Sequence, residues 1–540
     1  MSMPADRQTG EGTDGAIWLA ALVLGLFALH FWWLEVVAED AYITFRFAQN
    51  VADGHGFVWN VGEPPVEGYT NFLWLLICAG VIALGLDVTV FSQVAGFVLA
   101  LGTLALVYRW ARTGFGLAPL HALIPCLLLA AAGPFATWAG SGMETTFFGF
   151  LLTLGCWLFT LALMRGGRGW WSVWALVMVL CSMTRPEGVM VFCLLSGLVV
   201  LARLPSIGRA VAELALPWGF YLLLFGAYFA WRYDYFGWPL PNTFYAKTGG
   251  GADQAVRGVK HAIWFYLFFV VPVGLAFLPV LHRLRLPGLP PLAEGRGGWI
   301  AANAPWIVPF AVVSVYSAYI AVVGGDYMAM FRFFAPLTPM VYLLLGGAVA
   351  ALWPARPGLF APVGLATAVI ALLIQSTPLE AKIFPRMYQN HGTWRGVETE
   401  RWHADRLAVI GRYFASISPS PEASLATGGI GVIGHIVDMK VMGLHGLVDT
   451  HIAHKDYAPG ELGSGLPGHE RGDLDYIFSK RPTYFMYSRR LTKEVFGEEP
   501  KPLPAEAQAI VDAEYELVSV QLEDPANGEA GYFTYWEHRP

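Results

Sequence analysis

Long apolar runs alternate with short polar segments over the first 376 residues, and this alternation predicts a helical membrane domain. A helix needs about 20 apolar residues to cross a bilayer, and runs near that length fall around 16–37, 90–108, 117–134, 146–164, 170–184, 188–202, 211–231, 261–281, 303–323, 334–352 and 358–376. The pattern predicts about eleven transmembrane helices over 16–376, after a cytoplasmic tail at 1–15. Because the first run is longer than the roughly 7–15 residues of a signal-peptide core, we interpret it as an uncleaved span.

The segment 70–86 is also apolar, but the arginine pattern argues against a further span. Without a crossing there, the short arginine-bearing loops all share one side, as cytoplasmic loops do; they carry Arg109, Arg112, Arg165, Arg168, Arg203, Arg209, Arg283, Arg285 and Arg356. We therefore interpret 70–86 as a helix lying at the membrane interface or dipping into it. It belongs to a large first outer loop at 38–89, and the N-terminus is expected inside.

The character of the chain changes after residue 376, where charges, prolines and glycines become frequent. This change predicts that residues 377–540 form one soluble extracytoplasmic domain of mixed α/β structure and of ordinary domain size. Composition agrees with a membrane protein, because 56% of residues are hydrophobic and only 14% are charged, against roughly 25% charged in soluble domains. The net charge of −6 gives no support for nucleic-acid binding, which needs a basic face. The five cysteines lie in apolar stretches and are interpreted as small core residues.

Ionisable residues gather in short motifs of the predicted outer loops, where side chains near membrane depth mark function by default. The first motif, Glu39 to Arg46, follows the first span directly and opens with the adjacent carboxyl groups of Glu39 and Asp40. These acids either fix the end of the span or supply a general base, which contributes roughly 10²–10⁴-fold to a rate.

The other motifs each allow a structural and a functional interpretation. Residues 63–71 offer Glu67, Tyr69 and Asn71 for sugar binding, or form a turn into the interfacial helix. Ser141 and Glu144 fit a capping box, which leaves room for Glu144 to face a cavity. Arg185 and Glu187 either pair to hold a turn or take part in the site. A further rigid outer loop ends in Lys247, and the motif that contains Asp326 is followed by Arg332.

On the predicted topology all these loops converge on one face of the membrane. A phosphate leaving group needs cations or a metal to take up its charge, and Arg46, Arg185, Lys247 and Arg332 are the candidates. A hydroxyl nucleophile needs a base. A cation site and a base on the same face of the membrane suit transfer of a group from a membrane-anchored phosphate to an alcohol.

At these motifs the sequence resembles the GT-C class of glycosyltransferases, and within it most the family of the terminal arabinofuranosyltransferase B, which uses decaprenyl-phosphoryl-arabinose. The matching strings lie between about residues 35 and 340: 39–46, 55–60, 62–63, 66–71, 141–144, 185–187, 241–243, 246–247, 324–326 and 332. They fit the wider family better than this one branch, and the chain is shorter, so the sugar and the acceptor stay open.

The resemblance implies a GT-C-like fold, a polyprenyl-phosphate-linked sugar donor, an acceptor hydroxyl on a glycan or another molecule, and a bacterial plasma membrane as location. It makes Asp40 the catalytic base, with Glu39, Glu67, Tyr69, Asn71, Glu144, Glu187 and Asp326 as supporting or acceptor-binding groups. Arg332 is expected at the donor phosphate. A divalent cation is compatible with the sequence but not required by it.

The segment 426–431 of the C-terminal domain invites comparison with a nucleotide-binding loop, but it lacks the Walker lysine and the G-x-G-x-x-G spacing. We interpret it as a turn between strands, which together with Asp438 and Asp449 could help bind an acceptor glycan. Two other classes of function remain: a lipid or sugar transporter, which tends to show duplicated halves that are not visible here, and a non-catalytic glycan-binding membrane subunit.

Overall fold

The computed structural model describes residues 8–204, 206–271, 296–352, 392–418, 420–458 and 460–539. The chain divides into two compact units. The helical unit comprises residues 1–36, 93–230 and 258–397, and the sheet unit comprises 37–92, 231–257 and 398–540. The predicted first outer loop and the segment around Lys247 therefore belong to the same compact unit as the C-terminal part of the chain.

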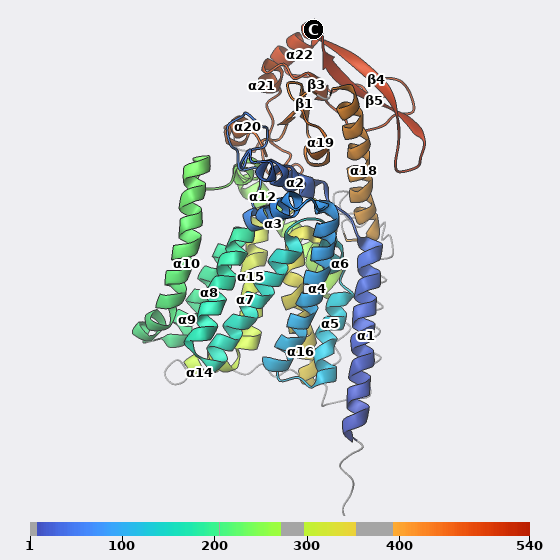
Figure 1. The fold of residues 1–540 in the computed structure, drawn as a ribbon. Helices are drawn as coiled ribbons and strands as arrows, with labels where there is room; N and C mark the ends of the chain where they lie inside the picture. The colour runs from blue at the N-terminus through green and yellow to red at the C-terminus, as the bar shows by residue number, and fades with distance from the viewer. Residues whose placement is uncertain are drawn as a thin grey trace, which may run out of the picture. The chain divides into compact units, whose positions relative to one another are not determined.

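The helical unit is a bundle of long apolar helices (Figure 1). Helix α5 packs against α1 and α16, and α7 packs against α8 and α15. The elements that lie wholly or largely in this unit are α1 (Gln8–Leu34), α4 (Val88–Thr113), α5 (Pro119–Ala130), α6 (Gly133–Ala139), α7 (Thr145–Arg165), α8 (Arg168–Thr184), α9 (Glu187–Arg203), α10 (Ile207–Phe236), η1 (Tyr266–Val270), α14 (Arg296–Ala302), α15 (Ala304–Val322), η2 (Ala329–Leu337) and α16 (Thr338–Leu352).

Six helices among the described residues are long and apolar enough to cross a bilayer, and a seventh crossing arises if α5 and α6, which meet at 70°, form one broken span. The predicted spans at 170–184 and 188–202 correspond to α8 and α9, of 17 residues each. The predicted span at 358–376, and the later part of the one at 261–281, lie outside the described residues. A total of eleven therefore stays a prediction.

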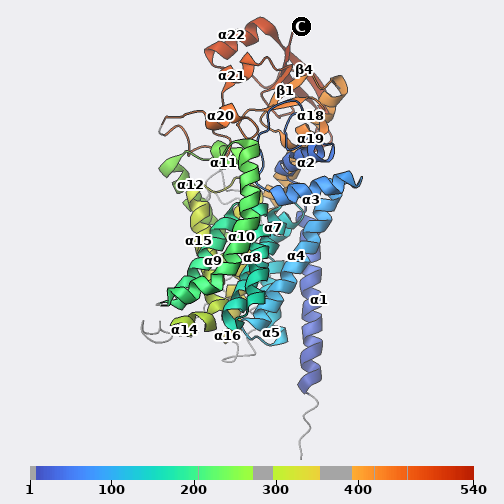
Figure 2. The same ribbon diagram turned by 60° about the vertical axis from the view of Figure 1, so that its left-hand side comes forward.

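The arginines of the predicted inner loops and the acidic motifs lie at opposite ends of the helical bundle. Glu144 precedes α7 and Arg165 ends it, and 21 helical residues span about 31 Å. Arg168 opens α8, whose other end leads into Arg185. The start of α1, the turn between α4 and α5, and α14 lie together at one end of the bundle in both views (Figures 1 and 2). This is the arrangement that the predicted inside and outside loops require.

The apolar segment after residue 70 forms α3 (Phe72–Ala83), a helix of only 12 residues. At 1.5 Å per residue it is about 18 Å long, which is too short for a hydrocarbon core of roughly 30 Å. The segment therefore does not cross a membrane as a single straight helix, in agreement with the interpretation drawn from the arginines.

The sheet unit is built around a five-stranded sheet of order β2-β1-β3-β5-β4. Strand β1 pairs in parallel with β2 and β3, whereas β3, β5 and β4 pair antiparallel. The strands are β1 (Ser424–Thr427), β2 (Lys440–Gly443), β3 (Tyr484–Met486), β4 (Tyr515–Glu523) and β5 (Ala530–His538). The segment 426–431 does not form a turn directly between strands as expected, because it leads from the end of β1 into the short helix α19 (Gly431–Ile436), which precedes β2.

The first outer loop contacts strand β2, where Trp59 Nε1 donates to Val441 O at 2.7 Å. Several helices complete the unit. They are α2 (Glu39–Ala52), α3, α11 (Asn242–Lys247), most of α18 (Trp394–Ile417), α19, α20 (Thr450–His454), α21 (Leu474–Ser479) and α22 (Ala505–Glu514), with the first half of α12 (Gly251–Phe265). Helix α2 packs against α3 and α19. Four cysteines are buried as expected, but Cys193 on α9 is exposed.

Candidate active site

The residues predicted to form the site fall into both units, and each set is described within its own unit. The sheet unit holds Glu39, Asp40, Arg46, Glu67, Tyr69, Asn71 and Lys247; the helical unit holds Glu144, Arg185, Glu187, Asp326 and Arg332.

Glu39 and Asp40 form the first turn of α2. Acidic side chains suit this position because the helix dipole is positive there. Glu39 Oε1 accepts a hydrogen bond of 2.5 Å from the backbone N–H of Gly431, at the start of α19. A Cβ atom at residue 431 would lie 2.1 Å from the Glu39 carbonyl oxygen. Only glycine fits so close an approach, so Gly431 allows the C-terminal part of the chain to contact the acid pair.

The two neighbouring acids differ in their electrostatic setting. Burial, reinforced by the negative charge of Asp40, raises the pKa of Glu39 to about 8, against the opposing effects of the Gly431 N–H and the Arg489 charge. Glu39 is therefore mostly protonated at neutral pH and is a poor base there.

Half-buried histidines of the C-terminal part lie near Asp40. The Asp40 charge acts on the pKa of both His403 and His469, but burial dominates and lowers both, that of His403 to about 4. The guanidinium Nη1 of Arg489 lies 3.3 Å from His403 Nε2. His445 lies next to His469, with ring centroids 4.9 Å apart, and burial lowers its pKa to about 4. These histidines are neutral at physiological pH, and Arg489 brings a positive charge to the group.

Sequence reasoning missed His403, His445, His469 and Arg489 because no motif contains them. They come from α18 and from three separate loops of the C-terminal part. The only sequence signal for the three histidines is that this part of the chain is rich in histidine. Their spacing is irregular, so the sequence does not indicate that the fold brings them together.

Lys247 lies beside the same group. It ends α11, and its side chain passes Gly468, where a Cβ atom would lie 3.2 Å from the lysine Cε. Its positive charge lowers the pKa of the adjacent His469, which also senses Asp40. The sheet unit thus places one predicted cation and the predicted base around a shared histidine.

The Arg46 side chain has a structural role, because its hydrogen bonds join α2 to other segments of the sheet unit. All five N–H groups are engaged: Nε donates to Trp59 O (2.9 Å), Nη1 to the carbonyl oxygens of Gly434 and Val437, and Nη2 to Asn60 Oδ1 and Met439 O (both 3.1 Å). Because a guanidinium has five N–H donors in all, none remains for a phosphate. We therefore no longer count Arg46 among the candidate phosphate ligands.

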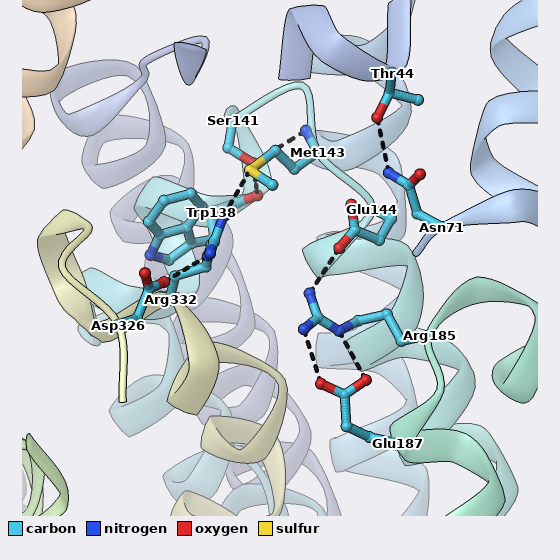
Figure 3. A network of polar contacts seen from close by, with 10 residues as sticks. All are labelled: Thr44, Asn71, Trp138, Ser141, Met143, Glu144, Arg185, Glu187, Asp326 and Arg332. Atoms are coloured by element: carbon cyan, nitrogen blue, oxygen red, sulfur yellow. Dashed lines mark hydrogen bonds and ion pairs between the residues drawn. The ribbon is translucent and has the colours of Figure 1, made fainter. Parts of the chain in front are cut away.

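The three residues predicted for sugar binding in the segment 63–71 are buried. Glu67 pairs with Arg232, with Nη2 2.7 Å from Oε2 and Nε 2.8 Å from Oε1. The Tyr69 ring packs 4.9 Å from that of Phe47, and Asn71 Nδ2 donates to Thr44 Oγ1 at 3.0 Å (Figure 3). Their contacts support the structural alternative, a turn that leads into α3.

In the helical unit, Arg185 lies between two carboxylates (Figure 3). Its Nη1 is 2.7 Å from Glu144 Oε1 and its Nη2 is 2.8 Å from Glu187 Oε1, and all three side chains are buried. The ion-pair interpretation of Arg185 and Glu187 is thus correct and extends to Glu144. The capping box is not formed, because Ser141 Oγ donates to Trp138 O and accepts from the N–H of Met143.

Arg332 lies in a strained turn of the helical unit. Its Nε donates to Asp326 Oδ2 at 2.6 Å, and its Nη1 lies 3.7 Å from Met143 Sδ (Figure 3). Met330 and Phe331 have φ of 53° and 49°, a left-handed conformation that costs non-glycine residues of order 1–3 kcal/mol. Strain of this kind collects at functional sites, and here it orients the segment that carries Arg332.

Among the described residues, no three His, Cys, Asp or Glu side chains come together in a way that would hold a metal ion. The divalent cation that the sequence allows is therefore not assigned to any residue.

Two curated proteins are similar to this chain in sequence, and both are terminal β-(1→2)-arabinofuranosyltransferases. The chain is 28% identical to that of Mycobacterium tuberculosis over 352 residues, covering 60% of this chain and 54% of the relative. It is 26% identical to that of Corynebacterium glutamicum over 385 residues, covering 61% and 51%. The chain spans about half the length of these relatives. No protein-family model matches it.

Solved structures of ArnT from Cupriavidus metallidurans share the fold. The structure bound to undecaprenyl phosphate has a TM-score of 0.58 at 13% identity and covers 96% of this chain and 97% of its own. The apo structure has a TM-score of 0.57 at 14% identity and covers 98% of both chains. The resemblance to arabinofuranosyltransferases is thus confirmed in sequence, and the GT-C-like, multi-spanning fold is confirmed in structure.

Proposed function

We propose that this chain is a membrane glycosyltransferase that moves a sugar from a polyprenyl-phosphate donor to a hydroxyl group of a cell-envelope glycan. The reaction takes place on the extracytoplasmic face of a bacterial plasma membrane. The observation that carries the proposal is the placement of Asp40 in the first turn of α2, directly after the first span and beside a protonated acid. Arabinofuranose is the sugar we propose first, because both similar proteins are named for its transfer.

The proposed chemistry assigns the proton and the leaving charge to different groups. Asp40 accepts the proton of the attacking hydroxyl as its oxygen bonds to the anomeric carbon. The bond between that carbon and the phosphate oxygen breaks, and the polyprenyl phosphate leaves with the negative charge. Lys247, in the sheet unit, is the proposed cation on the side of the base, and Arg332, in the helical unit, is proposed separately from the resemblance; charge-assisted hydrogen bonds to phosphate are the strong ones.

Glu39 has a supporting part in this proposal. With a pKa of about 8 it carries a proton at neutral pH, so it can donate a hydrogen bond but not compete as a base. Protonation of Glu39 also avoids two adjacent, half-buried negative charges, which like-charge repulsion disfavours. Asp40 is then the member of the pair that meets the hydroxyl.

The two other classes of function make different demands on the same residues. A transporter would move its lipid or sugar unchanged, and a non-catalytic subunit would bind glycan without needing Asp40. The placement of Asp40 beside Glu39, whose pKa is raised, with the charges of Arg489 and Lys247 nearby, supports the enzyme, because binding alone requires no base.

The proposal is tested with purified chain in lipid nanodiscs, supplied with decaprenyl-phosphoryl-arabinose and an arabino-oligosaccharide acceptor. We expect products longer by one pentose in mass spectra, together with free decaprenyl phosphate. Surface glycan from a deletion strain should lack the same residue. Unchanged glycan in that strain, together with intact donor in the purified reaction, would contradict arabinose transfer; a panel of other polyprenyl-phosphate sugars then tests the wider proposal.

A further inference from the structure

A polar cleft lies in the sheet unit, apart from the acid pair. Its volume is about 230 Å³, and its walls come from the second half of α2, the segment 55–61 and the segment 434–440. Gln49, Asn50 and Asp53 line one wall, and Asp438 and Lys440 line the facing one. Since a water molecule occupies about 30 Å³ in the liquid, this space corresponds to about eight waters, which suits a single sugar ring.

The walls of this cleft are fixed in place by Arg46. Its guanidinium ties α2 to the carbonyl oxygens of Gly434, Val437 and Met439, all of which belong to lining residues. Asn60 adds a second tie, because its Oδ1 accepts from the Val441 N–H at 2.9 Å. The cleft is therefore built into the packing of the first outer loop on the C-terminal part, which favours binding without reorganisation.

The chemistry of the lining selects among ligand classes. Asp53 and Asp438 are both exposed, and these two carboxylates face one ammonium group, that of Lys440. The positive charges of Arg46 and Lys440 balance these carboxylates. Because all the Arg46 N–H groups donate to protein acceptors, only Lys440 offers a charged donor to a phosphate, which the two carboxylates would repel. Polar and charged side chains outnumber the apolar ones in the lining, which are those of Val61, Pro421, Val437 and Met439, and this disfavours a lipid chain. Carboxylate acceptors next to amide and ammonium donors match hydroxyl groups, which both donate and accept.

Helix geometry separates this cleft from the acid pair. Gln49 lies nine residues after Asp40 on α2, which is about 13 Å along the helix axis. One sugar ring cannot contact both places. A ligand that reaches both must be a chain of several sugar residues.

We propose that this cleft binds a neutral sugar residue of the acceptor glycan, several residues away from the hydroxyl that reacts. The inference rests on the proposed function for the identity of the glycan, and it extends that function to a length-dependent recognition of the acceptor. Asp438 and Lys440 are the residues that recognise it, from the C-terminal side of the cleft.

The test compares a cleft variant with a matched control in the full chain. The cleft variant combines Asp438→Asn with Lys440→Gln, and the control combines Glu506→Gln with Lys501→Gln, two exposed positions elsewhere in the sheet unit. Binding of arabinohexaose is measured by saturation-transfer NMR and calorimetry without any donor. We expect at least tenfold weaker binding in the cleft variant and normal binding in the control. Equal binding in both variants, or no binding of hexaose by the unmodified chain at millimolar concentration, would overturn the proposal.

Kinetics with acceptors of two lengths separate the cleft from the proposed function. In the cleft variant, KM should rise at least tenfold for a hexasaccharide and stay constant for a disaccharide, with kcat unchanged. Unaltered KM values for both acceptors overturn the cleft and leave the transferase standing. Donor-free binding that depends on Asp438 and Lys440, in a chain that transfers no sugar, supports the cleft and contradicts the transferase.

Discussion

Glu39 Oε1 and the backbone nitrogen of Gly431 lie 2.5 Å apart, although 392 positions separate the two residues in the chain. This hydrogen bond joins the predicted base region to the C-terminal part of the protein. The C-terminal part therefore contributes to the environment of the acid pair, through this contact and through the charge of Arg489.

Gly431→Ala should destabilise the sheet unit. The added methyl group would lie 2.1 Å from the Glu39 carbonyl oxygen, and overpacking of this kind typically costs about 1–3 kcal/mol. Thermal unfolding in detergent, followed by limited proteolysis of the sheet unit, measures the loss. Gly80→Ala is the control: nothing lies within 4 Å of its Cβ, and alanine is the better helix former. Equal stability of the two variants would show that α2 and α19 are not in close contact.

Glu39 should make the stability of the sheet unit depend on pH. Its pKa rises on folding from 4.5 to about 8, so the folded state binds the proton more tightly. The stabilisation from this proton is complete below about pH 4.5 and is lost as the pH rises through about 8, with a slope of at most about 1.4 kcal/mol per pH unit.

The difference in unfolding between the unmodified chain and Glu39→Gln, measured from pH 5 to 9, isolates this effect. Asp40→Asn should shift the midpoint to lower pH, because the Asp40 charge helps to raise the pKa of Glu39. A difference that does not vary with pH would contradict the protonated state of Glu39 on which its supporting role depends.

Arg46→Lys should destabilise the protein rather than weaken donor binding. Lysine has three donors on one nitrogen and cannot reproduce the planar arrangement of five. Hydrogen bonds to charged groups contribute about 1.5–3 kcal/mol each, so the loss should reach about 3 kcal/mol. Chemical unfolding measures it, with Arg490→Lys as control because the Arg490 side chain is 79% exposed. A stable Arg46→Lys protein with impaired donor binding would return Arg46 to the phosphate ligands.

Lys247→Met should weaken binding of the donor by at least tenfold while the fold is retained. Lys247 is half-buried at the end of α11, and loss of one charge-assisted contact to phosphate is worth about 1.5–3 kcal/mol. Donor affinity is measured with decaprenyl phosphate by competition. Arg332→Lys should show a smaller loss, because the charge stays but the bidentate geometry does not. Full affinity in Lys247→Met would remove Lys247 from the donor site.

The sequence predicted the parts of the molecule in which periodicity and charge leave a direct mark. Apolar runs located the helices of the bundle, and the arginines separated α3 from the spans. The motifs singled out Asp40, Arg185 and Arg332 as candidate site residues, and their roles in a reaction stay predictions. The roles of Arg46 and Glu67 were not predictable, because a charged residue in a motif looks the same whether its partner is a ligand or a backbone carbonyl hundreds of positions away. The histidines near Asp40 were not predictable for the same reason. Only the tertiary packing of α18 and two separate loops brings them near Asp40.

The most direct test of the account is the turnover of Asp40→Asn in purified chain with decaprenyl-phosphoryl-arabinose and an arabino-oligosaccharide. Asparagine keeps the shape of the side chain and removes its basicity, so kcat should fall by about two to four orders of magnitude while donor binding and unfolding stay close to those of the unmodified chain. Glu39→Gln, the matched neighbour, should lose far less, because Glu39 is already protonated. If Asp40→Asn transfers sugar at nearly the normal rate, Asp40 is structural and the proposed mechanism is wrong.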